Sequence, residues 1–208
     1  MDLLVATRSV DKIVEIRRIL GAVPGLRVID LDSAGITKDS FEEELEPYET
    51  FEENARSKAE YFHAKSGMPT VADDSGLVVD ALGGAPGVRS KRFAPDRGLS
   101  GKELDQANND HLLVKLGDLD IAARTCRYIC AAVLVGAVDL FVVVRGEAEG
   151  LIVGHPRGCG GFGYDPYFFD PKIGKTFAEL DIERKNERSH RGRAFRALAD
   201  ELIARGIR

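Results

Sequence analysis

Apolar positions in the first part of the chain form two short runs with a helical pattern between them. The runs cover Leu3–Ala6 and the region near Leu26–Leu31. The apolar residues between the runs share one helical face, and Gly21 closes the segment: Val10, Ile13, Ile16 and Leu20. A strand, a helix and a second strand in this order predict an α/β architecture.

The next segments repeat this alternation. Residues 51–65 read as a helix with an apolar stripe on one side: Phe51, Ala55, Ala59 and Phe62. Thr70–Ala72 then predicts a short strand that runs directly into Asp73-Asp74-Ser75-Gly76. Helical character returns around residues 100–116.

The second half of the chain predicts strands, a loop and a last helix. Residues 124–135 and 138–147 favour a hairpin across Gly136-Ala137, and the glycine-rich segment 158–164 reads as a loop. Ser189 is the expected N-cap of the last helix, which ends near Gly206. Its apolar stripe is Phe195, Leu198, Ala199, Leu202 and Ile203. One compact α/β domain with a cleft over residues 1–208 is the resulting expectation.

Composition narrows the class of protein. With 44% hydrophobic residues, and 34 Asp and Glu against 29 Lys and Arg, the chain is globular and carries a net charge of −5. A net acidic chain is a poor general binder of nucleic acid. No apolar run reaches a membrane span of about 18 residues, and no secretory signal is visible at the start. Only three cysteines favour a reducing cytoplasm.

Charge is spread unevenly. Residues 39–53 hold eight acids and no Lys or Arg, whereas residues 184–196 hold six Lys or Arg and one acid. Each run alone fits a solvated face. The pair also suits a metal-binding side and a phosphate-binding side.

Three features could carry chemistry. Asp73 and Asp74 follow an apolar strand, where carboxylates could hold Mg²⁺, although the same residues also suit a turn or a helix cap. Lys58 lies within the apolar stripe of its helix, either with its ammonium in water or aimed at a phosphate. Two helix starts could hold anions or simply be capped: Thr7-Arg8-Ser9 with Lys12, and Ser189 with His190 and Arg191.

Other motifs carry less information. Gly158–Gly163 matches the spacing GxGxxG, but Tyr-Asp-Pro follows instead of a helix, which argues against dinucleotide binding. Phe162 in this loop fits either a ring stacked on a base or a core aromatic. Cys126 and Cys130 lack a second pair at zinc spacing, and no GxSxG elbow is present.

The chain resembles the inosine triphosphate pyrophosphatase family over nearly its whole length. The blocks that carry the resemblance are Leu-Val-Ala-Thr with Lys12 (4–12), Thr-Phe-x-Glu-Asn-Ala-x-x-Lys-Ala (50–59), Val-Ala-Asp-Asp-Ser-Gly-Leu (71–77), Leu-Gly-Gly-Ala-Pro-Gly-Val (82–88), Gly-Gly-Phe-Gly-Tyr-Asp-Pro (160–166) and Ser-His-Arg-Gly (189–192). The resemblance implies a mixed α/β fold with a long twisted sheet flanked by helices, and two lobes with an active-site cleft between them. It also implies a homodimer and Mg²⁺-dependent cleavage of XTP, ITP and dITP to a nucleoside monophosphate and pyrophosphate.

The resemblance also implies roles for individual residues. Asp74 matches the catalytic acid, and Glu46, Asp73 and Asp74 match the metal site. The residues implied to contact the nucleotide are Thr7, Arg8, Ser9, Lys12, Lys58, Ser75, Phe162, Gly163, Tyr164, Asp165, Lys185, His190 and Arg191. The family commonly has Thr-Gly-Asn in its first loop, where this chain has Thr7-Arg8-Ser9.

Two alternatives differ in their chemistry. A nucleotide sensor without turnover would keep Phe162 and the basic helix start, but it would not need Asp73, Asp74 and Glu46. A broader pyrophosphatase of the related septum-inhibitor-like family prefers modified pyrimidines. The Phe-Gly-Tyr-Asp and Ser-His-Arg blocks argue against that second alternative.

Overall fold

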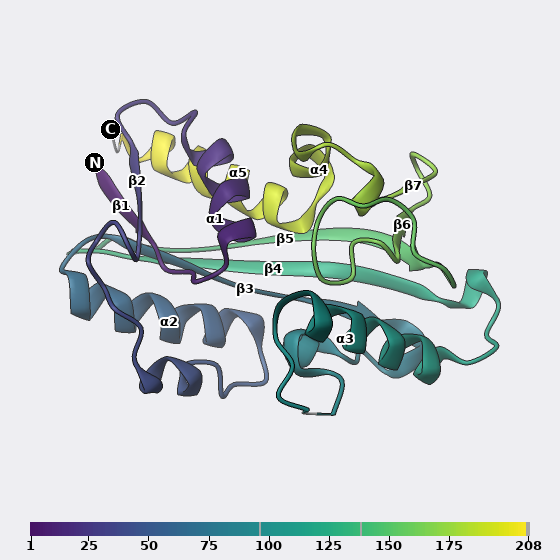
Figure 1. The fold of residues 1–208 in the computed structure, drawn as a ribbon. Helices are drawn as coiled ribbons and strands as arrows, with labels where there is room; N and C mark the ends of the chain where they lie inside the picture. The colour runs from purple at the N-terminus through teal and green to yellow at the C-terminus, as the bar shows by residue number, and fades with distance from the viewer. Residues whose placement is uncertain (96, 138, 207–208) are drawn as a thin grey trace. The chain divides into compact units, whose positions relative to one another are not determined.

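The fold is built around one mixed sheet. The structure is a computed structural model that describes residues 1–95, 97–137 and 139–206. The strands follow the order β2-β1-β3-β4-β5-β6-β7 in a seven-stranded sheet (Figure 1). β1 pairs in parallel with β2 and β3, whereas β6 pairs antiparallel with β5 and β7. The predicted mixed α/β class, with helices flanking a long sheet, is confirmed.

Helices and strands alternate along the first two thirds of the chain. The strands are β1 (Asp2–Val5), β2 (Arg27–Asp30), β3 (Thr70–Val79), β4 (Thr125–Val135), β5 (Phe141–Ile152), β6 (Phe168–Asp170) and β7 (Lys175–Thr176). The α-helices are α1 (Val10–Leu20), α2 (Phe51–Ser66), α3 (Gly101–Leu116), α4 (Ile182–Arg188) and α5 (His190–Ala204). Short 3-10 helices are η1 (Ser40–Glu44), η2 (Asp80–Leu82), η3 (Gly87–Arg92), η4 (Ile121–Ala123) and η5 (Phe177–Glu179).

The chain divides into two compact units. The first unit contains Met1–Asp74, Cys130–Gly146 and His190–Arg208, and the second contains Ser75–Ile129 and Glu147–Ser189. The strands β3, β4 and β5 each have residues in both units. Two lobes were expected; the cleft expected between them stays a prediction.

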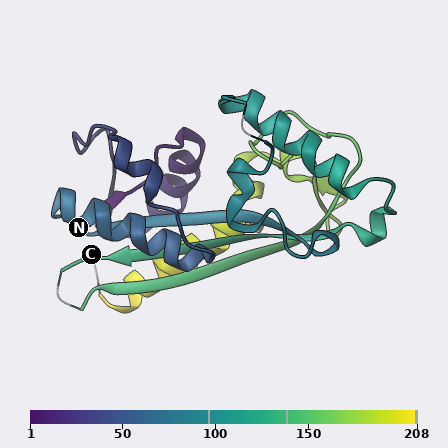
Figure 2. The same cartoon turned by 90° about the horizontal axis from the view of Figure 1, so that it is seen from below.

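The first unit has helices on both faces of its strands. α1 and α5 pack together on one face, and α2 lies on the other (Figures 1 and 2). Leu3 and Val5 belong to the core under α1 and α5, whereas Leu4 and Ala6 belong to the core under α2. Successive strand residues point to opposite faces, so a run that is apolar at every position is what a strand covered on both faces requires.

A glycine allows α5 to approach β5 closely. A Cβ built on Gly146 would lie 2.2 Å from the carbonyl oxygen of His190 and 2.5 Å from the backbone nitrogen of Ala194. Any other residue here would therefore push the first turn of α5 away from the strand. This close approach fixes the start of α5, which carries His190 and Arg191.

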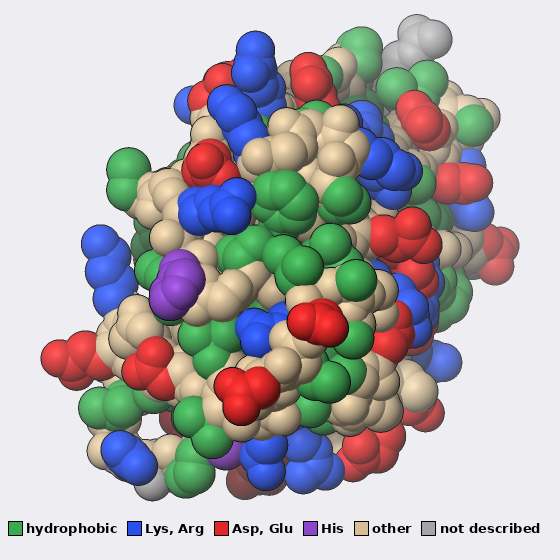
Figure 3. Space-filling view, turned by 90° about the vertical axis from the view of Figure 1, so that its right-hand side faces the viewer, with side chains coloured by type: hydrophobic (Ala, Val, Ile, Leu, Met, Phe, Trp, Pro, Cys, Tyr) green, Lys and Arg blue, Asp and Glu red, His purple; other side chains and the backbone are tan. Residues whose placement is uncertain are grey.

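The second unit has a separate aromatic core. Tyr128, Phe168 and Phe177 contact one another there, with ring centroids 4.5 to 6.0 Å apart. α3 contributes Leu112 and Leu116 to the same core. On the face drawn in Figure 3, acidic and basic side chains are interspersed.

Most predicted elements are confirmed, with local corrections. Val10 and Ile203 were expected on apolar faces, but they are exposed by 74% and 55% because each lies at the edge of its helical stripe. The strands β4 and β5 are neighbours in the sheet. The expected start of the second strand, at position 138, lies outside the described residues.

Across residues 1–95, 97–137 and 139–206, no helix is both long and apolar enough to cross a membrane.

Candidate functional site

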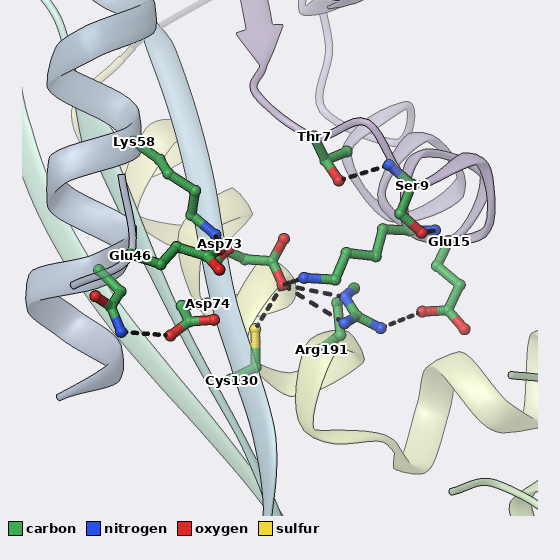
Figure 4. A network of polar contacts seen from close by, with 11 residues as sticks. Thr7, Ser9, Glu15, Glu46, Lys58, Asp73, Asp74, Cys130 and Arg191 are labelled. Atoms are coloured by element: carbon green, nitrogen blue, oxygen red, sulfur yellow. Dashed lines mark hydrogen bonds and ion pairs between the residues drawn. The ribbon is translucent and has the colours of Figure 1, made fainter. Parts of the chain in front are cut away.

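The centre of the site lies on β3, where one prediction was wrong. The strand does not end at Ala72; it continues through Asp73 and Asp74 to Val79. Val71 faces the core under α1 and α5, and Ala72 faces the core under α2. Asp73 and Asp74 continue this alternation, so the two carboxylates lie on opposite faces of the strand (Figure 4).

Asp73 is surrounded by cations. Its Oδ2 accepts hydrogen bonds from Lys12 Nζ at 3.0 Å and from Arg191 Nε at 3.4 Å, and the Cys130 thiol lies 3.8 Å away. Arg191 also donates to Glu15 Oε2 at 2.7 Å. Burial alone would raise the pKa of Asp73, but Lys12, Arg191 and Lys58 outweigh it and hold that pKa well below its usual value. These contacts explain how a charged residue can lie inside a buried strand.

Asp74 has different surroundings. Asn54 of α2 donates an amide hydrogen bond to its Oδ2 at 3.1 Å. Burial raises the pKa of Asp74, and the nearby Glu46 carboxylate raises it further, while Lys58 opposes both effects. Asp74 is therefore a more basic carboxylate than a solvated aspartate, as a group that accepts a proton from water needs to be.

Lys58 links Glu46 to the backbone of β3. Its Nζ donates to Glu46 Oε1 at 2.6 Å and to the backbone carbonyl of Asp73. The Lys58 side chain is only 13% exposed, so its ammonium does not extend into water. Burial lowers the pKa of Lys58, but Glu46, Asp74 and Asp73 outweigh this effect and the net direction is upward.

The residues on this face suit a divalent cation that arrives with a phosphate ligand. Among the described residues, no group of three or more His, Cys, Asp or Glu could hold a metal ion by itself. Mg²⁺ commonly takes one or two protein carboxylates and completes its shell with water and substrate phosphates. Asp74 and Glu46, whose charge raises the pKa of Asp74, fit that pattern. Asp73 faces the opposite core and is held by Lys12 and Arg191.

The turn before α1 contains the expected helix cap, whereas anion binding at this turn stays a prediction. The Ser9 backbone N–H donates to Thr7 Oγ1 at 3.1 Å, and the Lys12 N–H donates to Ser9 Oγ at 3.3 Å, which makes Ser9 the N-cap of α1. Lys12 then extends to Asp73. Arg8 lies in the same turn, and its guanidinium contacts Glu42 at 2.7 Å.

The glycine-rich loop of the second unit holds a buried ion pair beside an aromatic ring. Asp165 Oδ2 accepts from Lys185 Nζ at 2.6 Å and from the Phe162 N–H at 2.8 Å. The same ammonium lies 4.5 Å from the centroid of the Phe162 ring. Gly161 has φ +68°, and a Cβ there would lie 2.2 Å from Asp165 Oδ2, so this turn requires glycine.

α3 fixes the tip of this loop. The Gly163 N–H donates to Asp105 Oδ2 at 2.9 Å, and the Gly163 carbonyl accepts from Asn109 Nδ2, also at 2.9 Å. The next residue, Tyr164, is buried in the core, and its hydroxyl donates to the Ser90 carbonyl at 2.7 Å. These hydrogen bonds therefore hold the backbone next to Phe162 in place.

The remaining predicted residues lie close to these groups in the chain. Ser75 follows Asp74 in β3 and is half-buried. Ser189 lies between α4 and α5, where its N–H donates to the Lys185 carbonyl and ends α4. His190 is buried at the start of α5.

Sequence reasoning missed several residues of the site. Asn54 and Lys58 are four residues apart in α2, and this spacing places both on one helical face, so the predicted helix could have revealed Asn54. Asp181 caps α4 by accepting from the Arg184 N–H, a start signal for a helix that was not predicted. Glu15, Asp105 and Asn109 carry no local signal, because their partners lie far away in the sequence.

The chain is similar to known proteins along nearly its whole length. The sequence model of the Ham1 family matches residues 3–201. The dITP/XTP pyrophosphatase of Geobacter sulfurreducens is 43% identical over 205 residues, which cover 99% of this chain and 98% of that protein. The dITP/XTP pyrophosphatase of Mycolicibacterium paratuberculosis is 45% identical and covers 96% and 95% of the two chains.

Solved structures agree with the sequence comparison. A HAM1 protein from Coxiella burnetii superposes with a TM-score of 0.83 at 32% identity, over 98% of this chain and 99% of that one. The Staphylococcus aureus Ham1 protein gives a TM-score of 0.82 at 34% identity, over 99% and 100% of the two chains. The fold and the site define an α/β protein of the class to which these proteins belong. The chain is a member of the Ham1 family.

Proposed function

We propose that the protein hydrolyses non-canonical purine nucleoside triphosphates. In this reaction a water molecule breaks the anhydride bond between the α and β phosphates, and XTP, ITP or dITP becomes the nucleoside monophosphate and pyrophosphate. The names of the relatives from Geobacter sulfurreducens and Mycolicibacterium paratuberculosis, dITP/XTP pyrophosphatase, support this reaction and its enzyme class. The observation that carries the proposal is the grouping of Asp74, Glu46 and Lys58 on one face of β3.

We propose Asp74 as the general base. Its carboxylate would orient a water molecule and accept a proton from it, a role that suits its raised pKa. Asn54, through its hydrogen bond, would keep the carboxylate in one orientation. Mg²⁺, held by Glu46 and Asp74, would supply charge stabilisation to the phosphate oxygens. Asp73, predicted beside this metal site, would act through Lys12 by holding its ammonium in place.

The lysines would neutralise the triphosphate. Lys58 and Lys12 each already contact a carboxylate, so a phosphate that binds here would meet ammonium groups held in place in advance. The turn formed by Thr7 and Ser9 adds backbone N–H groups at the start of α1, where anions are favoured.

The glycine-rich loop is the proposed base-recognition element. Phe162 would stack on the purine, and donors from His190, Arg191 and backbone N–H groups would select the 6-keto oxygen of hypoxanthine or xanthine. Lys185 would contact the nucleotide beside this ring. Adenine presents an amino donor at that position, so buried donors would lose their partner. Ser75, Gly163, Tyr164, Asp165 and Arg191 keep their predicted contacts with the nucleotide as part of this proposal.

The wider setting of the protein is also a proposal. Residues 1–208 would form one functional domain, supported by the family match over residues 3–201. The three cysteines are free thiols, which suits a reducing cytoplasm. A small nucleotide would be the ligand, with no nucleic-acid or membrane partner, and the working form would be a homodimer.

Pyrophosphate release tests the proposal. Release from ITP, XTP, dATP, GTP and dTTP would be measured with Mg²⁺ and with EDTA. We expect metal-dependent release confined to ITP and XTP. Release from dTTP or from all five would assign a broader pyrophosphatase instead, and binding of ITP without release would assign a sensor.

A further inference from the structure

Arg8 makes an unusually complete set of contacts for a residue in a turn. Its Nη2 donates to Glu42 Oε1 at 2.7 Å and its Nε donates to Glu42 Oε2 at 3.0 Å, which makes the pair bidentate. Its Nη1 donates to the Ile36 carbonyl at 3.0 Å and to Asp32 Oδ1 at 3.3 Å. The guanidinium also lies 6.0 Å from the Phe62 ring centroid. Its donors thus point to the segment between β2 and α2.

Glu42 anchors that segment. The Glu42 side chain is only 7% exposed, and its Oε1 also accepts the Asp39 N–H at 3.3 Å in the capping box of η1. Hydrogen bonding to Arg8 lowers the pKa of Glu42, so the pair is ionised at neutral pH. A bidentate, partly buried arginine–carboxylate pair has one preferred geometry and restricts both partners.

The anchored segment ends at the proposed metal ligand. η1 is followed by Leu45, which is buried in the core under α2, and then by Glu46, which reaches Lys58. At the other end of the Arg8–Glu42 ion pair, Arg8 lies between Thr7 and Ser9, the residues that form the N-cap of α1. Arg8 therefore connects the turn that leads to Lys12 with the segment that carries Glu46.

We propose that Arg8 is a positioning residue that sets Glu46 relative to the phosphate-binding turn through its ion pair with Glu42. Its kinetic consequence rests on the function proposed above. The proposal replaces a direct contact between Arg8 and the nucleotide, because four of the acceptors around the guanidinium belong to the protein itself: both Glu42 oxygens, Asp32 and the Ile36 carbonyl.

The first measurement does not depend on activity. Amide hydrogen exchange of residues 39–46 would be compared in the wild type, Arg8→Ala, Arg8→Lys and Arg27→Ala. Arg27 is the matched control because it forms an exposed bidentate pair with Asp2, away from the site. We expect exchange about tenfold faster in Arg8→Ala, since the loss of about 1.4 kcal/mol of local stability gives that factor. Arg8→Lys keeps one charge contact, so its exchange rate should lie between those of the wild type and Arg8→Ala. The exchange rate in Arg27→Ala should match that of the wild type.

The second measurement is kinetic. In Arg8→Ala we expect the Mg²⁺ concentration for half-maximal activity to rise about tenfold, with kcat at saturating Mg²⁺ within about twofold of wild type. Glu42→Ala should reproduce this effect, and the double variant Arg8→Ala/Glu42→Ala should be no worse than Glu42→Ala alone, because both changes remove one interaction.

The outcomes separate the two proposals. A raised KM for ITP in Arg8→Ala, with unchanged exchange of residues 39–46, would overturn the positioning role and assign Arg8 to the nucleotide. Unchanged exchange together with unchanged kinetics would overturn it as well. If the wild type hydrolyses no nucleotide, the proposed function fails, and the exchange data still decide whether Arg8 holds this segment. Arg8→Lys serves for the same decision if Arg8→Ala does not fold.

Discussion

Two adjacent aspartates at positions 73 and 74 have opposite electrostatic settings. Asp73 lies against Lys12 and Arg191, and its pKa is lowered. Asp74 lies on the other face of β3 with Glu46 and Asn54, and its pKa is raised. When their surroundings shift the pKa values of two neighbouring carboxylates in opposite directions, the two groups usually have different roles. Here one suits an ion-pair network and the other suits proton transfer.

Matched isosteric substitutions should separate these roles. Asp74→Asn should reduce kcat at least about 100-fold, the effect of losing a general base, while ITP binding is kept. Asp73→Asn should instead lower the free energy of unfolding by about 3 kcal/mol, because Lys12 loses its buried counter-charge and Arg191 keeps its ion pair with Glu15 but not the one with Asp73. Steady-state kinetics and urea unfolding of both variants provide the comparison.

The two variants serve as controls for each other. Asp74→Asn with near wild-type kcat would remove Asp74 from the mechanism. If Asp73→Asn unfolded at the same urea concentration as the wild type, the ion-pair network would contribute no net stability.

At the scale of elements, periodicity predicted the helices well. α1, α2 and α5 follow from apolar spacing, because one face of each helix packs against a core. The end of β3 could not be predicted in the same way. Two aspartates normally stop a buried strand, and only partners distant in sequence, such as Lys12 and Arg191, permit it to continue.

In the site, too, some features could be predicted from the sequence and others depend on partners distant in sequence. The motif blocks indicated Asp74 and Lys58, and the family resemblance implied Glu46 from its position before Phe51, since residue type and order are visible in the sequence. The two faces of β3 and the tie from Arg8 to Glu42 are consequences of tertiary packing. A sequence alone does not say that the guanidinium of Arg8 turns toward residues 32–42 rather than toward a ligand.

The contact between α3 and the glycine-rich loop leads to a prediction about substrate binding. Asp105 and Asn109 each hold one backbone group of Gly163. Asp105→Ala or Asn109→Ala should raise KM for ITP up to about tenfold, because each removes a hydrogen bond worth about 1–1.5 kcal/mol that keeps Phe162 in place. We expect kcat to change less, since Asp74 lies on another element.

Asp110→Ala is the control for this contact. Asp110 is exposed on the same helix, where it accepts a hydrogen bond from the Gln106 side chain at 2.7 Å, and its removal tests the helix without touching the loop. Equal KM values for Asp105→Ala and Asp110→Ala would show that α3 does not position the loop for binding.

At the scale of the molecule, two compact units share three strands. β3, β4 and β5 begin in one unit and end in the other. A unit that unfolded alone would have to break the ladders of three strands in mid-length. Since those ladders hold buried residues along most of their length, we expect the whole chain to unfold as one cooperative system.

Arg191→Met tests this cooperativity, because the lesion is confined to the first unit. Removing the guanidinium deprives the buried Glu15 carboxylate of its hydrogen bond from Arg191 and leaves Asp73 with Lys12, which should cost about 3–5 kcal/mol. Hydrogen exchange of slowly exchanging amides would be followed in α1, in the first unit, and in β6, in the second. One cooperative system requires the same loss of protection in both, whereas independent units would confine the loss to α1. Arg205→Met, which alters an exposed pair with Glu201 just beyond α5, should leave protection unchanged in both.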